Sequence, residues 1–413
     1  MSITRRDLLG AASVVAGGLA FLRGQRAEAQ QAGATDTPGR LPYTPVVVPN
    51  GATLPWSMKD GVKEFHLTAE PVKHEVAPGM VINAWGYNGR TPGPVIEAVE
   101  GDRVRFYVHN KLPERTSVHW HGIFLPNGMD GVAGLNQPHI EPGETFVYEF
   151  TLKQNGVFMY HPHSDEMVEM ALGMMGFFVI HPRVPEVPRV DRHFVIMLHE
   201  WFVAPGTATP NPNVMTDFNL FTFNSRAWPG TAPLVARTGQ RVRVTFGNLS
   251  MDSHPIHIHG YRFWHVATDG GTIPPSARTP MTTINVPVGS TQTVEWVADV
   301  PGDWAFHCHK SHHTMNVMSH DVPNMIGVKQ QGVEERVRKV LPGYMAMGES
   351  GMGNMMEMGR PKNTLPMMTG TGPFGPIEMG GMFTVVKVRD GIATYDDPGW
   401  YKHPTGTVAH KLP

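Results

Sequence analysis

The strongest constraint on the fold is an internal duplication of the sequence. Four segments of the first half recur in the same order in the second: GDRVRFYV at 101–108 and GQRVRVTF at 239–246, HWHG at 119–122 and HIHG at 257–260, GETFVYEF at 143–150 and GSTQTVEW at 289–296, and GVFMYHPH at 156–163 and GDWAFHCH at 302–309. Repeated segments in one order indicate a repeated structural unit. We therefore predict two copies of one domain, over residues 45–185 and 190–330.

Each copy consists of short segments in which apolar and polar residues alternate between glycine- and proline-rich turns. Examples are residues 103–109, 146–152, 241–246 and 291–297. A two-residue period is typical of strands with one buried face, and many such strands in about 130 residues favour a Greek-key sandwich. We predict an all-β fold of two such domains, joined by the proline-rich residues 181–192. A Met- and Gly-rich segment then follows over 331–413, with one more strand from residue 383.

Residues 1–29 are predicted to be an export signal. Arg5 and Arg6 precede a weakly apolar run, and Ala27-Glu28-Ala29 is typical of a cleavage site. This pattern indicates bacterial twin-arginine export and places the protein in the periplasm or outside the cell. The apolar run is too short to span a bilayer, and no later stretch is long enough, so no membrane span is expected after removal of the signal.

The composition limits the kind of site that the chain can hold. The 413 residues include 22 His, 26 Met and a single Cys, with a formal net charge of −2. A chain without a basic field has no electrostatic basis for binding nucleic acid. One cysteine excludes an intrachain disulfide and any cysteine-cluster zinc or iron–sulfur site. What remains is a histidine-dominated site.

Four His-x-His pairs occur, two in each copy: His119 and His121, His161 and His163, His257 and His259, and His307 and His309. On a strand, residues i and i+2 lie about 6–7 Å apart on one face, which suits metal ligands. A single pair is more often structural. The duplication can bring all eight imidazoles together, however, and burying that many without a metal would be costly. Such a site suits copper, zinc or iron.

The second copy carries a further set of ligand types. Cys308 lies between the histidines of the last pair, so strand alternation points its sulfur away from their rings. With His254, His313 and Met318 it makes the ligand set of a type 1 (blue) copper centre. Met382, directly before the last predicted strand, is an alternative to Met318. The first copy has no such set, since the equivalent residues are Thr116, Pro162, Met167 and Leu172.

These motifs resemble the four copper-binding motifs of the multicopper oxidases: HWHG at 119–122, YHPH at 160–163, HPIHIHG at 254–260 and HCH-x3-H-x4-M at 307–318. The resemblance covers residues 60–330 and is specific, because all four motifs occur in order. Members usually have three cupredoxin domains, whereas small bacterial laccases have two. The resemblance therefore implies a two-domain, cupredoxin-like member of this family.

The resemblance also implies a role for each ligand. His254, Cys308, His313 and Met318 would bind type 1 copper, and His119 and His257 would bind type 2 copper. A type 3 pair would be bound by His121, His161, His163, His259, His307 and His309. Electrons from a reductant would pass through Cys308 to the trinuclear cluster, where O2 is reduced to water. Asp130 resembles the acidic residue that supplies protons there, although an Asp before Gly131 is also typical of a turn.

The partners implied are a reductant, O2 and two further copies of the chain. Two-domain members resemble homotrimers in which neighbouring subunits share each cluster. Cu(I) and a phenol or aromatic amine are both possible reductants. Ten methionines lie between residues 341 and 382, and thioethers select Cu(I), but methionine also fills irregular apolar gaps.

Two other functions are alternatives to copper-dependent O2 reduction. Copper nitrite reductases are also two-domain trimers, but their Cys lies in the first domain and their catalytic copper needs only three His. A periplasmic copper-binding or electron-transfer protein without turnover is the second alternative. Such a carrier needs only the type 1 set, so the four His-x-His pairs argue against it.

Overall fold

A computed structural model describes residues 43–316, 336, 339–340, 342 and 362–412. The predicted export signal and Met318 lie outside the described residues. The described residues from 45 onward belong to one compact unit. Strands dominate the described part of the chain, as predicted; short helices are α2 (Glu166–Ala171), η1 (Asn127–Met129), η2 (Pro275–Ala277) and η3 (Ser311–Thr314). None of the helices in the described part is long and apolar enough to cross a membrane.

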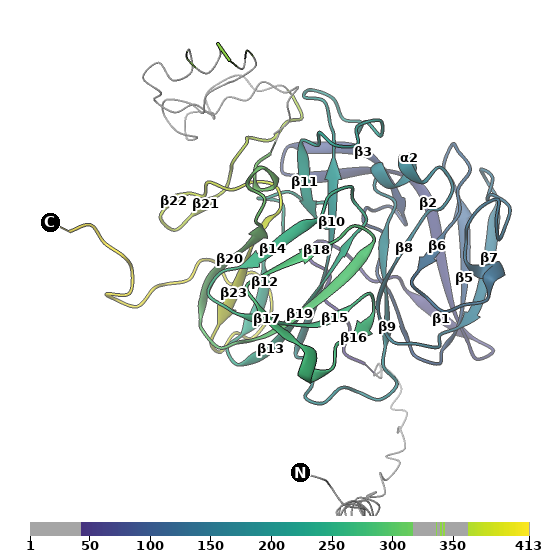
Figure 1. Ribbon diagram of the computed structural model, residues 1–413, viewed down its shortest axis with the longest axis horizontal. Coiled ribbons are helices and arrows are strands. Elements are labelled where there is room, and N and C mark those ends of the chain that lie inside the picture. The colour runs from purple at the N-terminus through teal and green to yellow at the C-terminus, as the bar shows by residue number, and fades with distance from the viewer. Residues whose placement is uncertain (1–42, 317–335, 337–338, 341, 343–361, 413) are drawn as a thin grey trace, which may run out of the picture. The chain divides into compact units, whose positions relative to one another are not determined.

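The strands of the first half form two sheets that enclose one core (Figure 1). One sheet runs β1-β2-β5-β7, with β3 also paired to β2, and the other runs β4-β9-β8-β6. Their bounds are β1 (Trp56–Lys59), β2 (Val62–Ala77), β3 (Met80–Tyr87), β4 (Ile96–Val99), β5 (Arg103–Asn110), β6 (His119–His121), β7 (Thr145–Thr151), β8 (Gly156–His161) and β9 (Gly176–His181).

The second half repeats this arrangement. One sheet runs β11-β10-β13-β19-β15-β16, with β17 paired to β15, and the other runs β12-β23-β20-β14-β18. Their bounds are β10 (Arg192–Trp201), β11 (Leu220–Phe223), β12 (Leu234–Arg237), β13 (Gln240–Asn248), β14 (His254–Ile258), β15 (Phe263–Thr268), β16 (Gly271–Thr272), β17 (Thr279–Met281), β18 (Thr283–Val286), β19 (Ser290–Ala298), β20 (Gly302–Cys308) and β23 (Phe383–Arg389). A small hairpin, β21 (Thr371–Gly372) with β22 (Gly375–Pro376), precedes β23.

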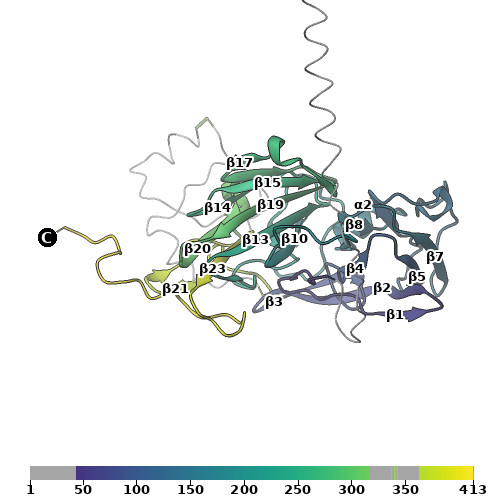
Figure 2. The ribbon, with the colours of Figure 1, turned by 90° about the horizontal axis from the view of Figure 1, so that it is seen from below.

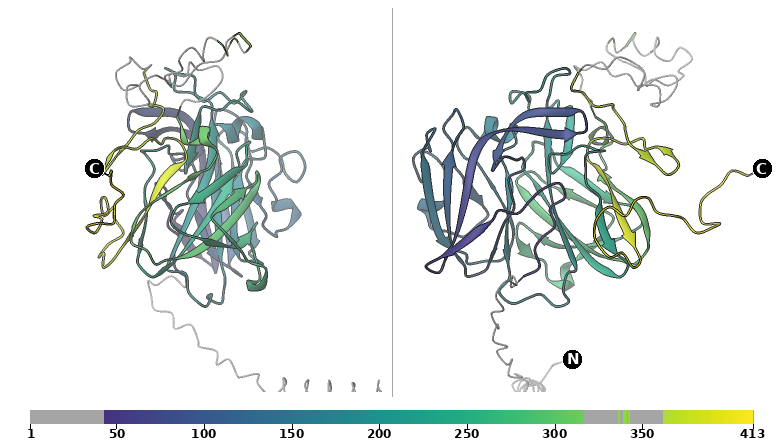
Figure 3. Two further views of the ribbon diagram at one scale, coloured as in Figure 1. Left: turned by 60° about the vertical axis from the view of Figure 1, so that its left-hand side comes forward. Right: turned by 180° about the vertical axis from the view of Figure 1, so that it is seen from behind.

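The sequence duplication is therefore a duplication of topology. β2 pairs parallel with β5 and β5 antiparallel with β7, just as β10 pairs parallel with β13 and β13 antiparallel with β19. Likewise β4-β9-β8-β6 corresponds to β12-β23-β20-β14, with the same sequence of parallel and antiparallel pairs. The strand expected from residue 383 is β23, which lies in the second sandwich beside the green strands in Figure 3. The domain boundaries at 185, 190 and 330 stay a prediction.

Alternation explains why the equivalent strands form. In β5 the side chains of Val104, Phe106 and Val108 are fully buried, and the residues between them are more exposed. β13 presents Val242 and Val244 to the second core in the same way. Each strand thus turns one apolar face inward, which is the pattern of a strand on one side of a sandwich.

Strands β8, β9 and β10 break this alternation because both of their faces are buried. Tyr160 and Phe178 point into the first core, whereas Met159 and Phe177 belong to a separate cluster with Met197 of β10. This central cluster joins the two sandwiches through apolar side chains. Figure 2 shows β8 and β10 at the middle of the molecule, between the strands of the two halves.

We expect Phe177→Ala to lower the free energy of unfolding by about 3–5 kcal/mol, because it opens a cavity in this central cluster. Phe177 is 2% exposed. Urea unfolding of the metal-free protein measures the change. Val147→Ala on β7 is the control, since Val147 is 48% exposed and should change the value by less than about 0.5 kcal/mol. Equal stability of the two variants would contradict this account of the interface.

Candidate metal centres

The histidines of the first half converge at the ends of β6 and β8. His119 and His121 are the terminal residues of β6, and His161 ends β8 directly across from His119. The ring of His119 lies 5.8 Å from that of His121, 5.3 Å from that of His161 and 5.7 Å from that of His163. Nδ1 of His121 is 3.2 Å from Nε2 of His161. We call these four residues the first histidine set.

The second half repeats this geometry on β14 and β20. His257 lies across from His307, and its ring is 5.0 Å from that of His259, 5.7 Å from that of His307 and 5.5 Å from that of His309. Nε2 of His259 is 3.2 Å from Nε2 of His307. These four residues are the second histidine set. Both sets follow from the i and i+2 spacing on paired strands.

Backbone carbonyls orient two rings of each set. His119 Nδ1 donates to Asp130 O at 2.8 Å, His161 Nδ1 to Pro162 O at 2.9 Å, His257 Nδ1 to Thr282 O at 2.7 Å and His307 Nδ1 to Cys308 O at 2.8 Å. Because a carbonyl only accepts, the proton is on Nδ1 and the lone pair is on Nε2. A metal-binding imidazole is held in this way, so both sets fit a metal.

Desolvation favours the neutral form of four of these eight imidazoles. Desolvation is the largest cause that lowers the pKa of His161 to about 3, and it also lowers the pKa of His121, His259 and His307. Neighbouring imidazoles act in the same direction. A metal binds the neutral ring, so no proton has to be displaced from these side chains at physiological pH.

Within the described residues of one chain, the two sets remain separate. Ring contacts occur inside each set, and none joins a histidine of the first to a histidine of the second. Figure 1 shows β6 among the strands of one sandwich and β14 among those of the other. His259 and His309 are exposed to solvent. The eight imidazoles that the duplication was expected to gather therefore form two groups of four.

A third cluster lies inside the second sandwich. Cys308 Sγ is 3.9 Å from His254 Nδ1 and 3.6 Å from His313 Nδ1, and the two nitrogens are 3.0 Å apart. All three side chains are fully buried. Cys308 belongs to the apolar core, whereas the flanking His307 contacts the second histidine set, so β20 carries its thiol and imidazoles on opposite faces as alternation predicts.

The chemistry of this cluster fits a copper ion. Burial raises the pKa of the Cys308 thiol to about 12 and lowers the pKa of His254 to about 3. A buried thiol loses its proton only if a cation replaces that proton, and a thiolate with two imidazoles suits copper. Met318 lies outside the described residues. Met382 is fully buried in the same core cluster as Cys308.

A buried acidic side chain lies next to the imidazoles of His254 and His313, on the side of their Nε2 atoms. Glu200, at the end of β10, is 2% exposed, and its Oε1 lies 3.5 Å from His254 Nε2 and 4.0 Å from His313 Nε2. Burial raises the pKa of Glu200 to about 7, and the amides of Met251 and Asp252 donate to its Oε2. Sequence reasoning missed Glu200. Its signal was a lone acidic residue within the apolar run FVIMLHEW of residues 194–201.

The first half carries two uncharged, hydrogen-bonded side chains at the place that corresponds to the Cys308, His254 and His313 cluster. Thr116, the equivalent of His254, donates to Oε2 of the buried Glu169 at 2.6 Å. Burial is the main cause that raises the pKa of Glu169 to about 9. The carboxyl is therefore protonated in the folded protein at neutral pH. The candidate proton donor Asp130 lies elsewhere, with its Oδ1 3.5 Å from Nδ1 of His119.

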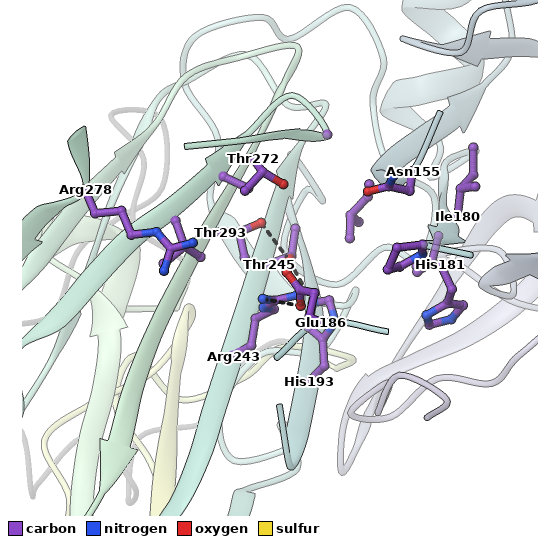
Figure 4. A pocket seen from close by; sticks show the side chains of 17 residues that line it. Asn155, Ile180, His181, Glu186, His193, Arg243, Thr245, Thr272, Arg278 and Thr293 are labelled. Atoms are coloured by element: carbon purple, nitrogen blue, oxygen red, sulfur yellow. Dashed lines mark hydrogen bonds and ion pairs between the residues drawn. The ribbon is translucent and has the colours of Figure 1, made fainter. Parts of the chain in front are cut away.

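A cavity of ≈ 70 Å³ lies apart from all candidate ligands. It is lined from one side by Asn155 and His181 and from the other by the second-half sheet (Figure 4). Among its lining residues, Arg243 pairs with Glu186 at 2.7 Å, and His193 Nε2 lies 2.9 Å from Thr245 Oγ1. None of the predicted ligands lines this cavity.

Sequence comparisons identify the class that this fold and these ligands define. Two sequence profiles described as multicopper oxidase match residues 68–185 and 205–327. The chain belongs to the multicopper oxidase family, which uses copper as its cofactor. A solved multicopper oxidase, mgLAC, shares the fold with a TM-score of 0.59 and 26% identity, over 82% of this chain and 89% of that one.

Two relatives are similar over part of their length. Copper resistance protein A of Escherichia coli is 34% identical over 238 residues, which are 46% of this chain and 39% of that protein. A probable nitrite reductase–hydroxylamine oxidoreductase fusion protein of Kuenenia stuttgartiensis is 29% identical over 274 residues, 63% of this chain and 31% of that protein. The chain thus spans less than half of either relative.

We expect Glu169→Gln to make stability less dependent on pH. The folded pKa of about 9 exceeds the ordinary value of 4.5, so the wild type is stabilised most below pH 4.5 and loses that stability as the pH rises toward 9. The free energy of unfolding of the variant, taken relative to that of the wild type, should therefore rise between pH 5 and pH 8, by at most about 1.4 kcal/mol per pH unit. Urea unfolding at several pH values measures it.

The control is Glu141→Gln, because Glu141 is exposed. Its stability should follow that of the wild type at every pH. A constant difference between Glu169→Gln and the wild type would show that Glu169 is ionised in the folded protein.

Proposed function

We propose that this protein oxidises a reductant in one-electron steps and couples four of them to the reduction of O2, with four protons, to two molecules of water. The observation that carries the proposal is the placement of ligands on β20. Cys308 faces the buried cluster with His254 and His313, while its neighbours His307 and His309 belong to the second histidine set. Family membership supports the same conclusion.

The ligand roles proposed are those of the family motifs. His254, Cys308 and His313 hold type 1 copper with a methionine, Met318 in the motif. His119 and His257 hold type 2 copper, and type 3 copper is held by His121, His161, His163, His259, His307 and His309. Copper at these places supplies reversible one-electron chemistry. The backbone from Cys308 to its neighbours, and the hydrogen bond from His307 Nδ1 to Cys308 O at 2.8 Å, link the electron-entry site to the oxygen site.

Asp130 is proposed to deliver protons to the oxygen site. Its backbone oxygen accepts from His119 Nδ1, and its carboxylate lies 3.5 Å from that nitrogen. The acid is held at the edge of the first histidine set and is partly exposed, so it can exchange protons with solvent. A positioned acid of this kind typically contributes about 10²–10⁴ in rate.

The reductant proposed first is Cu(I), with phenols and aromatic amines as the alternative. The relative named copper resistance protein A supports Cu(I), as do the methionines before β23. Of these, Met367, Met368, Met379 and Met382 lie within the described residues, and Met345, Met347, Met352, Met355, Met356 and Met358 lie outside them. A twin-arginine pattern at Arg5 and Arg6 supports export to the periplasm.

Copper loading tests the proposal directly. The purified protein should bind about four copper ions per chain, one with a blue absorption band and a type 1 EPR signal. Cys308→Ser should lose the blue band and at least about 100-fold of the O2 consumption, because it removes the thiolate and the link to the oxygen site. His66→Ala is the control, since His66 is exposed and outside both sets.

Oxygen uptake with Cu(I) and with a phenol ranks the two reductants, and anaerobic nitrite consumption tests the alternative activity. A wild type without a blue band, or one that reduces nitrite but consumes no O2, would overturn the proposal.

We also propose that the active form is a homotrimer in which the first set of one subunit meets the second set of the next. The separation of the two sets within one chain supports this. Exposed apolar side chains on the segments that follow β6 and β8 also support it: Phe124 at 66%, Leu135 at 79% and Met167 at 47%. A head-to-tail interface repeated around a ring joins two different surfaces, as this arrangement needs.

Complementation between subunits tests the shared site. His121→Ala and His309→Ala should each be inactive alone, but co-expressed they should regain activity at about a quarter of the sites, where two intact sets meet. Co-expressed His121→Ala and His163→Ala are the control and should stay inactive, because both damage the first set. Light scattering should give a trimer. An active monomer, or no recovery in a mixed trimer, would exclude the shared site.

A further inference from the structure

Met382, the residue directly before β23, lies opposite Cys308 of the buried cluster in the strand register. β23 pairs antiparallel with β20, with His307 opposite Phe383, and one step further Cys308 N donates to Met382 O at 3.1 Å. Residues opposite one another on neighbouring antiparallel strands point to the same face. Cys308 and Met382 accordingly both lie in the core cluster of the second sandwich and are fully buried, whereas the rings of His307 and Phe383 stack on the other face.

Met382 is also tied to a second residue of the cluster. Its amide donates to His313 O at 2.9 Å. Gly381 makes this close approach possible, because a Cβ at that position would lie 2.2 Å from His313 O, and its φ of +51° is one that side chains rarely adopt. The backbone of Met382 therefore joins Cys308 to His313.

We infer that Met382 supplies the thioether of the type 1 site, and that residues 317–381 are inserted in the ligand loop between His313 and Met382. The inference rests on the proposed function. Topology supports it, because β20 and β23 are neighbouring strands of one sheet and the loop that joins them begins with Cys308 and ends at Met382. Methionine is a weak, distant ligand of such sites and adjusts their potential.

Asn316 is the positioning residue that closes this loop at its base. It is fully buried, and its backbone N–H donates to Met367 O at 2.7 Å. Its side chain donates to Pro366 O at 3.0 Å and accepts from Gly381 N at 2.9 Å. The side chain of Asn316, which follows the ligand His313, is thus hydrogen-bonded to the segment directly before Met382. The position of the thioether therefore does not depend on the residues in between.

Spectra of the copper-loaded full-length protein test the assignment. Met382→Leu and Met382→Gln should both shift the blue band and the type 1 EPR signal, and the reduction potential should be higher in the Leu variant than in the Gln variant, because Leu offers no ligand atom and Gln offers an oxygen. Met318→Leu should leave all three unchanged. Met367→Leu is the control, since Met367 is 4% exposed and meets Asn316 through its backbone oxygen.

Unchanged spectra in both Met382 variants, or a shift in Met318→Leu, would overturn the assignment. If the Met382 variants fail to fold, Met318→Leu decides alone, because an unchanged blue band in that variant leaves Met382 as the ligand and a shifted band excludes it. Asn316→Ala should alter the EPR signal, and Asn316→Asp, which keeps the acceptor for Gly381 N, should restore part of it. A wild type without a blue band would instead refute the proposed function itself.

Discussion

The candidate sites depend on the alternation of side chains along β20. His307 and Cys308 are the last two residues of β20 and point to opposite faces, and His309 follows directly after the strand. The thiol therefore enters the core, while the imidazoles of His307 and His309 lie close to each other in the second histidine set. No rearrangement is needed to connect the two sites, since the shortest covalent path between them is the strand itself. The duplication then determines the surroundings, because each half carries paired histidines on equivalent strands.

Burial has opposite consequences in the two halves. In the second, removal from water keeps His254 neutral and Cys308 protonated, a state that only a cation changes. In the first, the equivalent place holds Thr116, which donates to Oε2 of the protonated Glu169. One topology therefore supports either a metal site or a neutral polar pair. The choice depends on a few side chains and leaves the sheets unchanged.

Much of this arrangement could be predicted from the sequence, because its signals are periodic. Alternation predicted the strands, the repeat predicted equivalent sandwiches, and His-x-His spacing predicted which histidines face one another. Glu200 was missed because it comes from a strand distant in sequence and carries no spacing signal. The repeat alone does not predict how far apart the two histidine sets lie, because it predicts equivalence of parts but not the distance between them. Only the resemblance to two-domain members, with clusters shared between subunits, implied that the sets lie apart within one chain. The role of Met382 needed the register of β20 with β23.

The place of β23 in the chain has a consequence for the order of folding. His307 pairs with Phe383, so the second sandwich is completed only when a segment far along the chain returns to it. Contacts so distant in sequence form slowly, and until then β20 is an edge strand that pairs only with β14. A nascent chain that has passed residue 330 already contains every histidine of the sites, but Cys308 still lacks its neighbour. Copper that arrives at this stage meets an incomplete second sandwich, so metal loading should follow the insertion of β23.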